Sequence, residues 1–234
     1  MNDTKPLGRK AYGSIAHLPG SRMGPGDHAC HPGQKVIATE KVRDRHDLVY
    51  VQEKLDGSCT AVAKVSGEII ALGRAGWRAD SSPYLQHVMF HDWVMANRSR
   101  FDALLNEGER VVGEWLAQAH GTRYDLTGRE PWVPFDIMRE TDRLPVYVTM
   151  LRTATVGFAS PALLAVGPTT IEAAMARLGE FGHYGALDPA EGVVWRVERD
   201  GKVDYLLKYV RPEKVDGCYL ESQTNAEAIW NWQP

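Results

Sequence analysis

The fold of this 234-residue chain is constrained most by short apolar runs that end in turns and alternate irregularly with helical segments. Runs rich in strand-favouring residues predict strands at about residues 48–54, 59–65, 69–72, 110–116, 132–138, 192–197 and 203–210. Apolar positions at helical spacing predict helices within residues 84–106, 169–181 and 225–232. Because these elements are intermixed without a β-α-β rhythm, the sequence predicts an α+β fold.

Glycine turns indicate how some of these strands connect. Ser66-Gly67 and Asp200-Gly201 each separate two strand-like runs and predict tight hairpins. Asp56-Gly57 joins the first two strands in the same way. We therefore expect residues 48–73 to form one antiparallel sheet, with Lys54 at a strand end.

Residues 1–47 are rich in glycine, proline, histidine and charge, and we expect an N-terminal extension packed on a core domain of residues 48–234. Arg22 lies in a glycine- and proline-rich stretch, which makes that loop a candidate phosphate site, although no helix start follows to support it. His28, Cys30 and His31 form a compact cluster, but a zinc site needs a fourth ligand, so we interpret them as structural.

Composition narrows the class of protein. The net charge is −3, so no global basic field indicates nucleic-acid binding, although a local basic groove remains compatible with it. Three cysteines, an odd number and far apart, disfavour a disulfide framework and favour the cytoplasm. The polar N-terminus and the absence of a long apolar window predict neither a signal peptide nor a membrane span.

Lys54 opens the sequence Lys54-Leu55-Asp56-Gly57, which places an amine beside an acid and a glycine turn. A neutral lysine amine can attack the α-phosphate of a nucleoside triphosphate, but burial or nearby cations must first lower its pKa. Gly57 would let the backbone approach a ligand closely. The alternative interpretation is a surface hairpin with a solvated lysine.

Three segments further along the chain carry side chains suited to binding a nucleotide. Arg74 lies in a glycine-rich turn and offers a guanidinium fork to phosphate or ribose oxygens. Glu114 lies within an apolar strand and needs a partner, either a ribose hydroxyl or a protein arginine. Phe135 either presents a flat face to a base or packs in the core.

Two later segments complete the set. Glu191 begins a strand beside a glycine, where a carboxylate suits a magnesium ion shared with triphosphate oxygens. Lys208 lies on the next strand, with Arg211 and Lys214 close behind it in the sequence. Each segment alone also fits ordinary packing or surface charge, and only their order along the chain favours one shared site.

This ordered array resembles the covalent nucleotidyltransferase superfamily of ATP-dependent polynucleotide ligases and mRNA capping enzymes. The matching segments are Lys54-Leu55-Asp56-Gly57, Gly113-Glu114, Phe135-Asp136-Ile137, Glu191-Gly192-Val193-Val194 and Leu207-Lys208. The chain is most similar to compact, phage-like RNA ligases of the type 2 class. The resemblance implies an ATP-grasp-like ligase adenylation domain with twisted antiparallel sheets flanked by helices.

The resemblance also implies roles for individual residues. Lys54 would be the nucleophile that becomes lysyl-AMP, and Lys208 would neutralise the α-phosphate and help keep that amine uncharged. The remaining residues would bind ATP or AMP: Glu114 the ribose, Phe135 and Glu53 the adenine, Arg74 ribose or phosphate, and Glu191 the Mg²⁺ or Mn²⁺ ion. The expected substrate is RNA with a 5′-phosphate and a 3′-hydroxyl, as in RNA repair.

Two departures from the family pattern qualify this expectation. The final motif usually carries two lysines one residue apart, but Leu206 and Val210 flank Lys208 here, which leaves Arg211 or Lys214 as substitutes. Residues 209–234 are too few for a C-terminal OB domain, so we expect none. We therefore expect a monomer with weak intrinsic affinity for RNA, and a partner protein is a candidate for supplying the missing grip.

Alternative functions remain open at this point. A DNA nick ligase and a capping guanylyltransferase would use the same lysine chemistry, and the missing OB domain argues against capping. A non-catalytic protein that binds nucleotides or RNA ends would keep the pocket, but it would not need the amine of Lys54.

Overall fold

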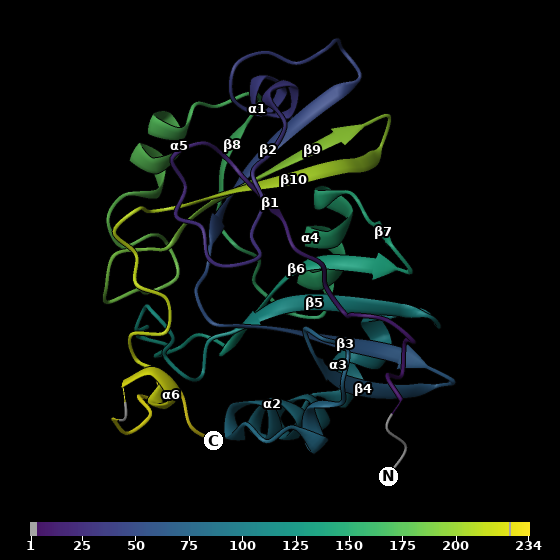
Figure 1. Ribbon diagram of the computed structural model, residues 1–234. Coiled ribbons are helices and arrows are strands. Elements are labelled where there is room, and N and C mark those ends of the chain that lie inside the picture. The colour runs from purple at the N-terminus through teal and green to yellow at the C-terminus, as the bar shows by residue number, and fades with distance from the viewer. Residues whose placement is uncertain (1–3, 225) are drawn as a thin grey trace.

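The computed structural model describes residues 4–224 and 226–234. Within these residues two five-stranded sheets lie one above the other in the view of Figure 1. The first sheet has the order β1 (Ala16–His17), β10 (Lys202–Val210), β9 (Gly192–Arg199), β2 (Asp47–Lys54) and β8 (Leu163–Val166). The second has the order β4 (Glu68–Gly73), β3 (Ser58–Val65), β5 (Glu109–Trp115), β6 (Trp132–Arg139) and β7 (Asp142–Arg143).

Helices cover the outer faces of the two sheets (Figure 1). Helices α1 (Pro32–Thr39) and α5 (Ile171–Leu178) pack on the first sheet, and α2 (Leu85–Ala96) and α3 (Arg98–Leu104) pack on the second. The other helical segments are η1 (Ala79–Ser81), α4 (Val146–Thr155) and α6 (Glu221–Thr224). The α+β fold with antiparallel sheets flanked by helices is therefore confirmed; β1, which runs parallel to β10, is the exception.

The expectation of one sheet over residues 48–73 is wrong. Strand β2 pairs with β8 and β9, whereas β3 pairs with β4 and β5 in the other sheet. The turn after Lys54 carries the chain from one sheet to the other. At Gly57 any Cβ would collide with the carbonyl oxygen of Trp115, so only glycine permits this crossing.

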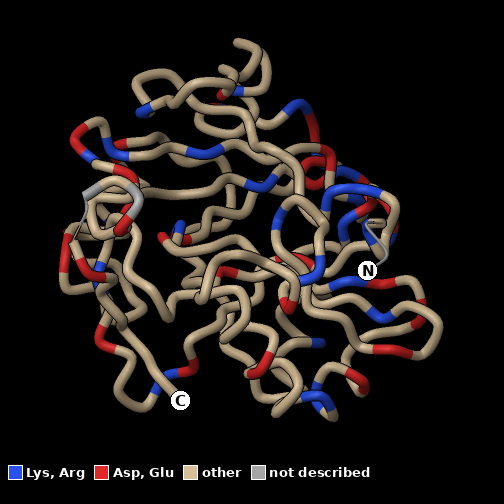
Figure 2. Tube along the Cα trace, turned by 60° about the horizontal axis from the view of Figure 1, so that its bottom comes forward, with Lys and Arg blue, Asp and Glu red and all other residues tan. Residues whose placement is uncertain are grey.

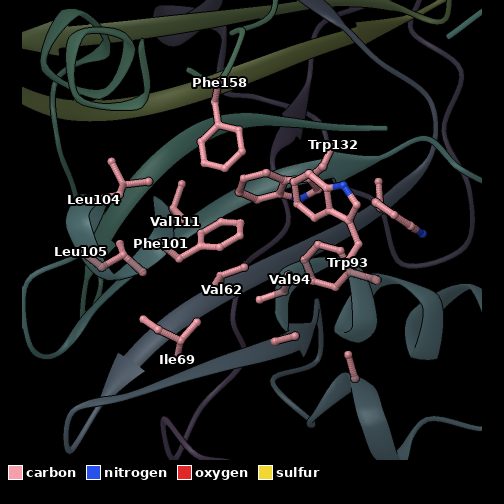
Figure 3. Packing of buried hydrophobic residues seen from close by; sticks show 14 of the residues in the cluster. Val62, Ile69, Trp93, Val94, Phe101, Leu104, Leu105, Val111, Trp132 and Phe158 are labelled. Carbon is pink, nitrogen blue, oxygen red and sulfur yellow. The ribbon is translucent and has the colours of Figure 1, made fainter. Parts of the chain in front are cut away.

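An aromatic cluster fills the space between the second sheet and its helices. Trp93 of α2 and Trp132 of β6 have ring centroids 6.0 Å apart, and Phe101 and Phe158 pack on the Trp132 ring at 5.5 Å and 5.4 Å (Figure 3). The Trp132 indole donates its N–H to Thr60 at 2.9 Å, so its one polar atom is satisfied. This cluster fixes the outer face of the second sheet.

Alternation along β2, β9 and β10 assigns the two faces of the first sheet. Val51, Trp195 and Leu207 are fully buried in the cluster that α1 and α5 cover. Their neighbours Lys54, Val194 and Lys208 line a cavity on the opposite face, toward the second sheet. In β9 and β10 the period of two thus separates core residues from cavity residues.

Most expected elements exist, with shifted boundaries. The helical segment 84–106 divides into α2 and α3 at Asn97, whose side-chain amide donates to Trp93 O at 2.9 Å. Thr170 caps α5 by accepting from Ala173 N at 3.2 Å, as predicted, but the helix ends at Leu178, where Gly179 follows with φ +72°, before Phe181. Helices α1 and α4 and strand β8 were not anticipated.

The expected last helix, residues 225–232, is wrong where the structure describes it. Residues 226–232 are not helical, and Trp230 instead forms a bridge with Gln118. The Asn231 side chain donates to Leu116 O at 2.7 Å and accepts from Tyr124 N at 3.0 Å, so backbone groups of the core hold the segment in place. Asn225 lies outside the described residues.

The N-terminal segment packs between the sheets and along β10. Ala16 and His17 form β1, and the Tyr12 hydroxyl donates to the buried Asp136 carboxylate at 2.6 Å. Among all the residues that the structure describes, no helix is long and apolar enough to cross a membrane.

Candidate active site

A cavity of about 920 Å³ lies between the inner faces of the two sheets. Seven predicted site residues line it together: Glu53, Lys54, Arg74, Glu114, Phe135, Glu191 and Lys208. Strands of both sheets and the turns beside them supply these residues, so residues far apart in the sequence meet because the sheets face each other. The geometry alone therefore brings the whole predicted set into one site.

Lys54 ends β2 and forms an ion pair with Glu191, which immediately precedes β9. Its Nζ donates to Glu191 Oε2 at 2.6 Å, and the Lys54 side chain is only 22% exposed. Burial alone would lower the pKa of Lys54, but the carboxylates of Glu191, Glu114 and Asp56 together raise it above the ordinary lysine range. In this state the amine is an ammonium, the opposite of the lowered pKa that the sequence analysis expected.

Two carboxyl groups beside Lys54 have unusually high pKa values. Burial raises the pKa of Glu191 to about 7, although the charge of Lys54 opposes the shift. Burial also raises the pKa of Glu114 to about 7, and the charge of Glu191 adds to that shift. Glu114 accepts from Gly57 N at 3.1 Å, which ties it to the turn that follows Lys54. Two acidic side chains with raised pKa values thus surround the Lys54 amine, and a second lysine, Lys208, lines the same cavity.

Asp56 is a structural residue of this turn. Its Oδ2 accepts from Gly121 N at 3.1 Å and Thr122 Oγ1 at 3.0 Å, and it pairs with the buried Lys214 at 3.1 Å. Lys214 is therefore committed to the turn and does not line the cavity. Arg211 donates to the carbonyls of Ala190 and Gly179 instead. Neither Arg211 nor Lys214 is among the described residues that line the cavity.

Lys208 lies on β10 and faces the cavity. Burial lowers the pKa of Lys208, and the nearby charge of Lys54 lowers it further. Its Nζ is 3.6 Å from Asp27 Oδ1, and Asp27 in turn contacts His17 Nε2 at 3.2 Å. The sequence analysis missed Asp27 because nothing in its glycine-rich surroundings indicates a partner on a distant strand.

Arg196 is a second cavity residue that the sequence analysis missed. It is 2% exposed, its Nη2 is 2.6 Å from Asp136 Oδ1, and its Nε and Nη1 have no hydrogen-bond partner among the described residues. Its register partner on β10 is Leu206, the position where a second lysine would stand. Strand alternation could have indicated Arg196, because Val194 and Arg196 lie on the opposite face of the strand from Trp195.

The remaining predicted residues line other walls of the cavity. Phe135 packs edge-on against Tyr12, with centroids 5.4 Å apart. Glu53 is buried and accepts from His183 N at 3.0 Å, and burial raises its pKa. Arg74 is exposed and donates to Gly13 O at 3.2 Å.

The other candidates from the sequence do not form sites. Arg22 pairs with Asp216 from a distant segment, and Gly24 N donates to Asp27 Oδ2 at 2.9 Å, so protein carboxylates already occupy these donors. Within residues 4–224 and 226–234, no group of three or more His, Cys, Asp or Glu side chains could hold a metal ion. A lone buried carboxylate such as Glu191 still fits Mg²⁺ or Mn²⁺, because such ions are held by one or two carboxylates plus substrate phosphates.

Comparison with known proteins identifies the family of the chain. Residues 47–210 match the family described as RNA ligase, which is more than half of the chain. The chain belongs to the RNA ligase family. No curated protein matches it.

Solved structures share the fold of this RNA ligase family member. An archaeal ATP-dependent RNA ligase is 19% identical with a TM-score of 0.52, and 85% of this chain covers 48% of that one. A putative ATP-dependent DNA ligase from Aquifex aeolicus is 17% identical with a TM-score of 0.55, covering 85% and 49%. A Lys-to-Ala mutant of Naegleria gruberi RNA ligase with ATP and Mn is 16% identical with a TM-score of 0.51, covering 83% and 58%. The chain spans about half the length of the first two structures.

Proposed function

We propose that this chain is an ATP-dependent RNA ligase that acts through a covalent lysyl-AMP on Lys54. The observation that carries the proposal is the Lys54 amine, 2.6 Å from Glu191, in a cavity that all seven predicted residues line. Membership of the RNA ligase family supports the same reaction. The domain is residues 48–234, with residues 1–47 as an extension packed on it.

The first step forms one bond and breaks another. The neutral Nζ of Lys54 attacks the α-phosphorus of ATP, a P–N bond forms, and the P–O bond to pyrophosphate breaks. Pyrophosphate leaves with the bonding electron pair, and the attacking nitrogen releases one proton to solvent and keeps one as the N–H of lysyl-AMP. AMP then passes to the 5′-phosphate of an RNA strand, and a 3′-hydroxyl displaces AMP to form the phosphodiester.

Charge around Lys54 would control when the amine can attack. The Glu191 carboxylate holds it as an ammonium, while burial favours the neutral form. A divalent cation bound at Glu191 would supply positive charge to the triphosphate. If Glu191 held the cation instead of Lys54, burial and the charge of Lys208 would favour loss of the Lys54 proton. Solved structures of a related ligase with ATP and Mn support ATP and a divalent ion as cofactors.

The other cavity residues would position the nucleotide. Phe135 stacks on adenine, Glu53 contacts its edge, and Glu114 accepts from the ribose hydroxyls. Arg74 contacts ribose or phosphate, and Lys208 neutralises the α-phosphate in the transition state. Arg196, with two unpartnered nitrogens on the cavity wall, is an additional source of positive charge for phosphate.

The test is covalent labelling. The protein is incubated with α-labelled ATP or GTP and a divalent metal, then denatured and separated on a gel. We expect label from ATP that is lost in Lys54→Ala. Lys64→Ala is the matched control, because Lys64 is 21% exposed and paired with Asp102 at 2.8 Å but does not line the cavity. No label in folded wild-type protein would contradict the proposal.

A second assay addresses the strand substrate. Purified protein with label on Lys54 is offered 5′-phosphorylated RNA or DNA, each as a nicked duplex and as open single strands. We expect sealed RNA product with a 3′-hydroxyl acceptor. Sealing of nicked DNA alone would instead support a DNA nick ligase, and a label that transfers to no strand would contradict ligase activity.

A further inference from the structure

The cavity continues beyond the nucleotide residues onto an exposed segment between β4 and α2. Trp77, Arg78, Ser82 and Tyr84 line this outer part, while Lys54 and Glu191 line the inner part of the same cavity. Trp77 is 45% exposed and Tyr84 is 60% exposed. Two large aromatic side chains therefore face solvent at the mouth of the cavity, which the nucleotide roles proposed above do not use.

The N-terminal segment adds positive charge to this segment. Ala11 N donates to Arg74 O at 3.0 Å, and a Cβ on Gly76, at φ +89°, would collide with the backbone of Arg9. Residues 9–11 are therefore packed against the Arg74 turn. Lys5 Nζ lies 5.0 Å from the centroid of the Trp77 ring. Blue segments gather near the described N-terminal end in Figure 2.

We call Trp77, Arg78 and Tyr84, with Lys5, Arg9, Lys10 and Arg74, the outer shelf. Arg9, Lys10 and Arg74 are exposed, and the acid paired within the shelf is Asp80, 3.2 Å from Arg78. The net charge of the chain is −3, so this local excess of cations beside aromatic rings shows that its charges are unevenly distributed. Proteins that bind single-stranded nucleic acid combine cationic side chains along the sugar-phosphate backbone with aromatic rings that stack on the bases.

We infer that the outer shelf binds unpaired nucleotides at the end of the RNA strand that the site joins. The inference rests on the proposed function and names the form of its substrate. Trp77 and Tyr84 stack on bases, and Arg78 and the N-terminal cations contact phosphates. A duplex is a poorer fit, because its bases already stack on each other and A-form RNA offers mainly phosphates and 2′-hydroxyls.

Binding is measured without nucleotide, by fluorescence anisotropy of a labelled, 5′-phosphorylated single-stranded oligoribonucleotide at fixed salt. We expect Trp77→Ala and Tyr84→Ala each to weaken binding about fivefold or more, since each removes a stacking platform. Trp77→Phe keeps a ring and should retain most of the affinity. The matched control is Tyr147→Ala, which removes a 52% exposed ring on α4, outside the cavity, and should change affinity less than twofold.

Salt dependence tests the cationic part separately. Arg78→Gln and Lys10→Gln should each reduce the slope of log affinity against log salt by about 0.7, the value for one phosphate contact on a single strand. Thermal unfolding of each variant checks that it is folded. We expect each to be folded, because the substituted side chains are exposed.

Three results would overturn the inference: no binding of single strands by wild-type protein, equal affinity of Trp77→Ala, Tyr84→Ala and wild type, or tighter binding of blunt duplex RNA. Failure of the proposed function has a different signature, because wild-type protein would then take no label from ATP whatever its affinity for RNA.

Discussion

The carboxyl groups around Lys54 should make the free energy of unfolding depend on pH. The pKa of Glu191 rises from the ordinary value of 4.5 to about 7 in the folded protein, chiefly through burial. The folded state therefore binds a proton that the unfolded state has lost at neutral pH. The stability that this proton contributes is fully present below about pH 4.5 and is lost as the pH rises through 7.

The size of the effect follows from the shift. Each pH unit between the two pKa values changes the free energy of unfolding by about 1.4 kcal/mol, so Glu191 alone accounts for a fall of about 3 kcal/mol between pH 4.5 and 7. Glu114, whose pKa is also about 7, adds a fall of the same sign. We expect wild-type stability to decrease across this interval and Glu191→Gln to show a clearly shallower decrease.

The assay is urea unfolding followed by tryptophan fluorescence between about pH 5 and pH 8. Glu172→Gln is the control, because Glu172 is fully exposed on α5 and its pKa is lowered by its own backbone N–H and by Thr170. Glu172→Gln should leave the pH dependence of the free energy of unfolding in this interval unchanged. Equal pH dependence of wild type and Glu191→Gln would refute the reasoning.

Three further predictions concern single side chains. Gly57→Ala should reduce stability by about 1–3 kcal/mol in urea unfolding, because the new methyl group meets the Trp115 carbonyl and Leu116, and wild-type stability would contradict the close approach. Lys208→Ala should slow lysyl-AMP formation about 100-fold in single-turnover labelling, with partial recovery in Lys208→Arg, and an unchanged rate would exclude its contact with the α-phosphate. Asn231→Ala should cost about 1–3 kcal/mol, since it leaves the carbonyl of Leu116 unpaired, and differential unfolding measurements with no shift would show that water replaces the amide.

The site was more predictable from the sequence than the arrangement of strands. Lys54, Glu114 and Lys208 lie on strands that alternation identifies, Glu191 immediately precedes another, and their order along the chain carried the resemblance. Alternation does not say which strands pair. The sheet crossing at Gly57 depends on how closely the backbone passes Trp115, which only the packed structure reveals.

The residues that sequence reasoning missed depend on contacts between distant segments. Arg196 is an arginine on a strand face that could equally have been solvent, and its burial beside Asp136 comes from the facing sheet. Asp27 lies in a loop with no regular pattern, yet β1 pairing brings it to Lys208. The raised pKa of Lys54 was also unpredictable, because it reflects three carboxylates gathered from separate turns and strands.

The covalent attachment of AMP is the central claim, and peptide mapping by mass spectrometry after incubation with ATP and a divalent metal tests it most directly. The account predicts one AMP adduct, on Lys54, joined through an acid-labile P–N bond and absent from Lys54→Ala. An adduct on another residue, or none in folded wild-type protein, would contradict it.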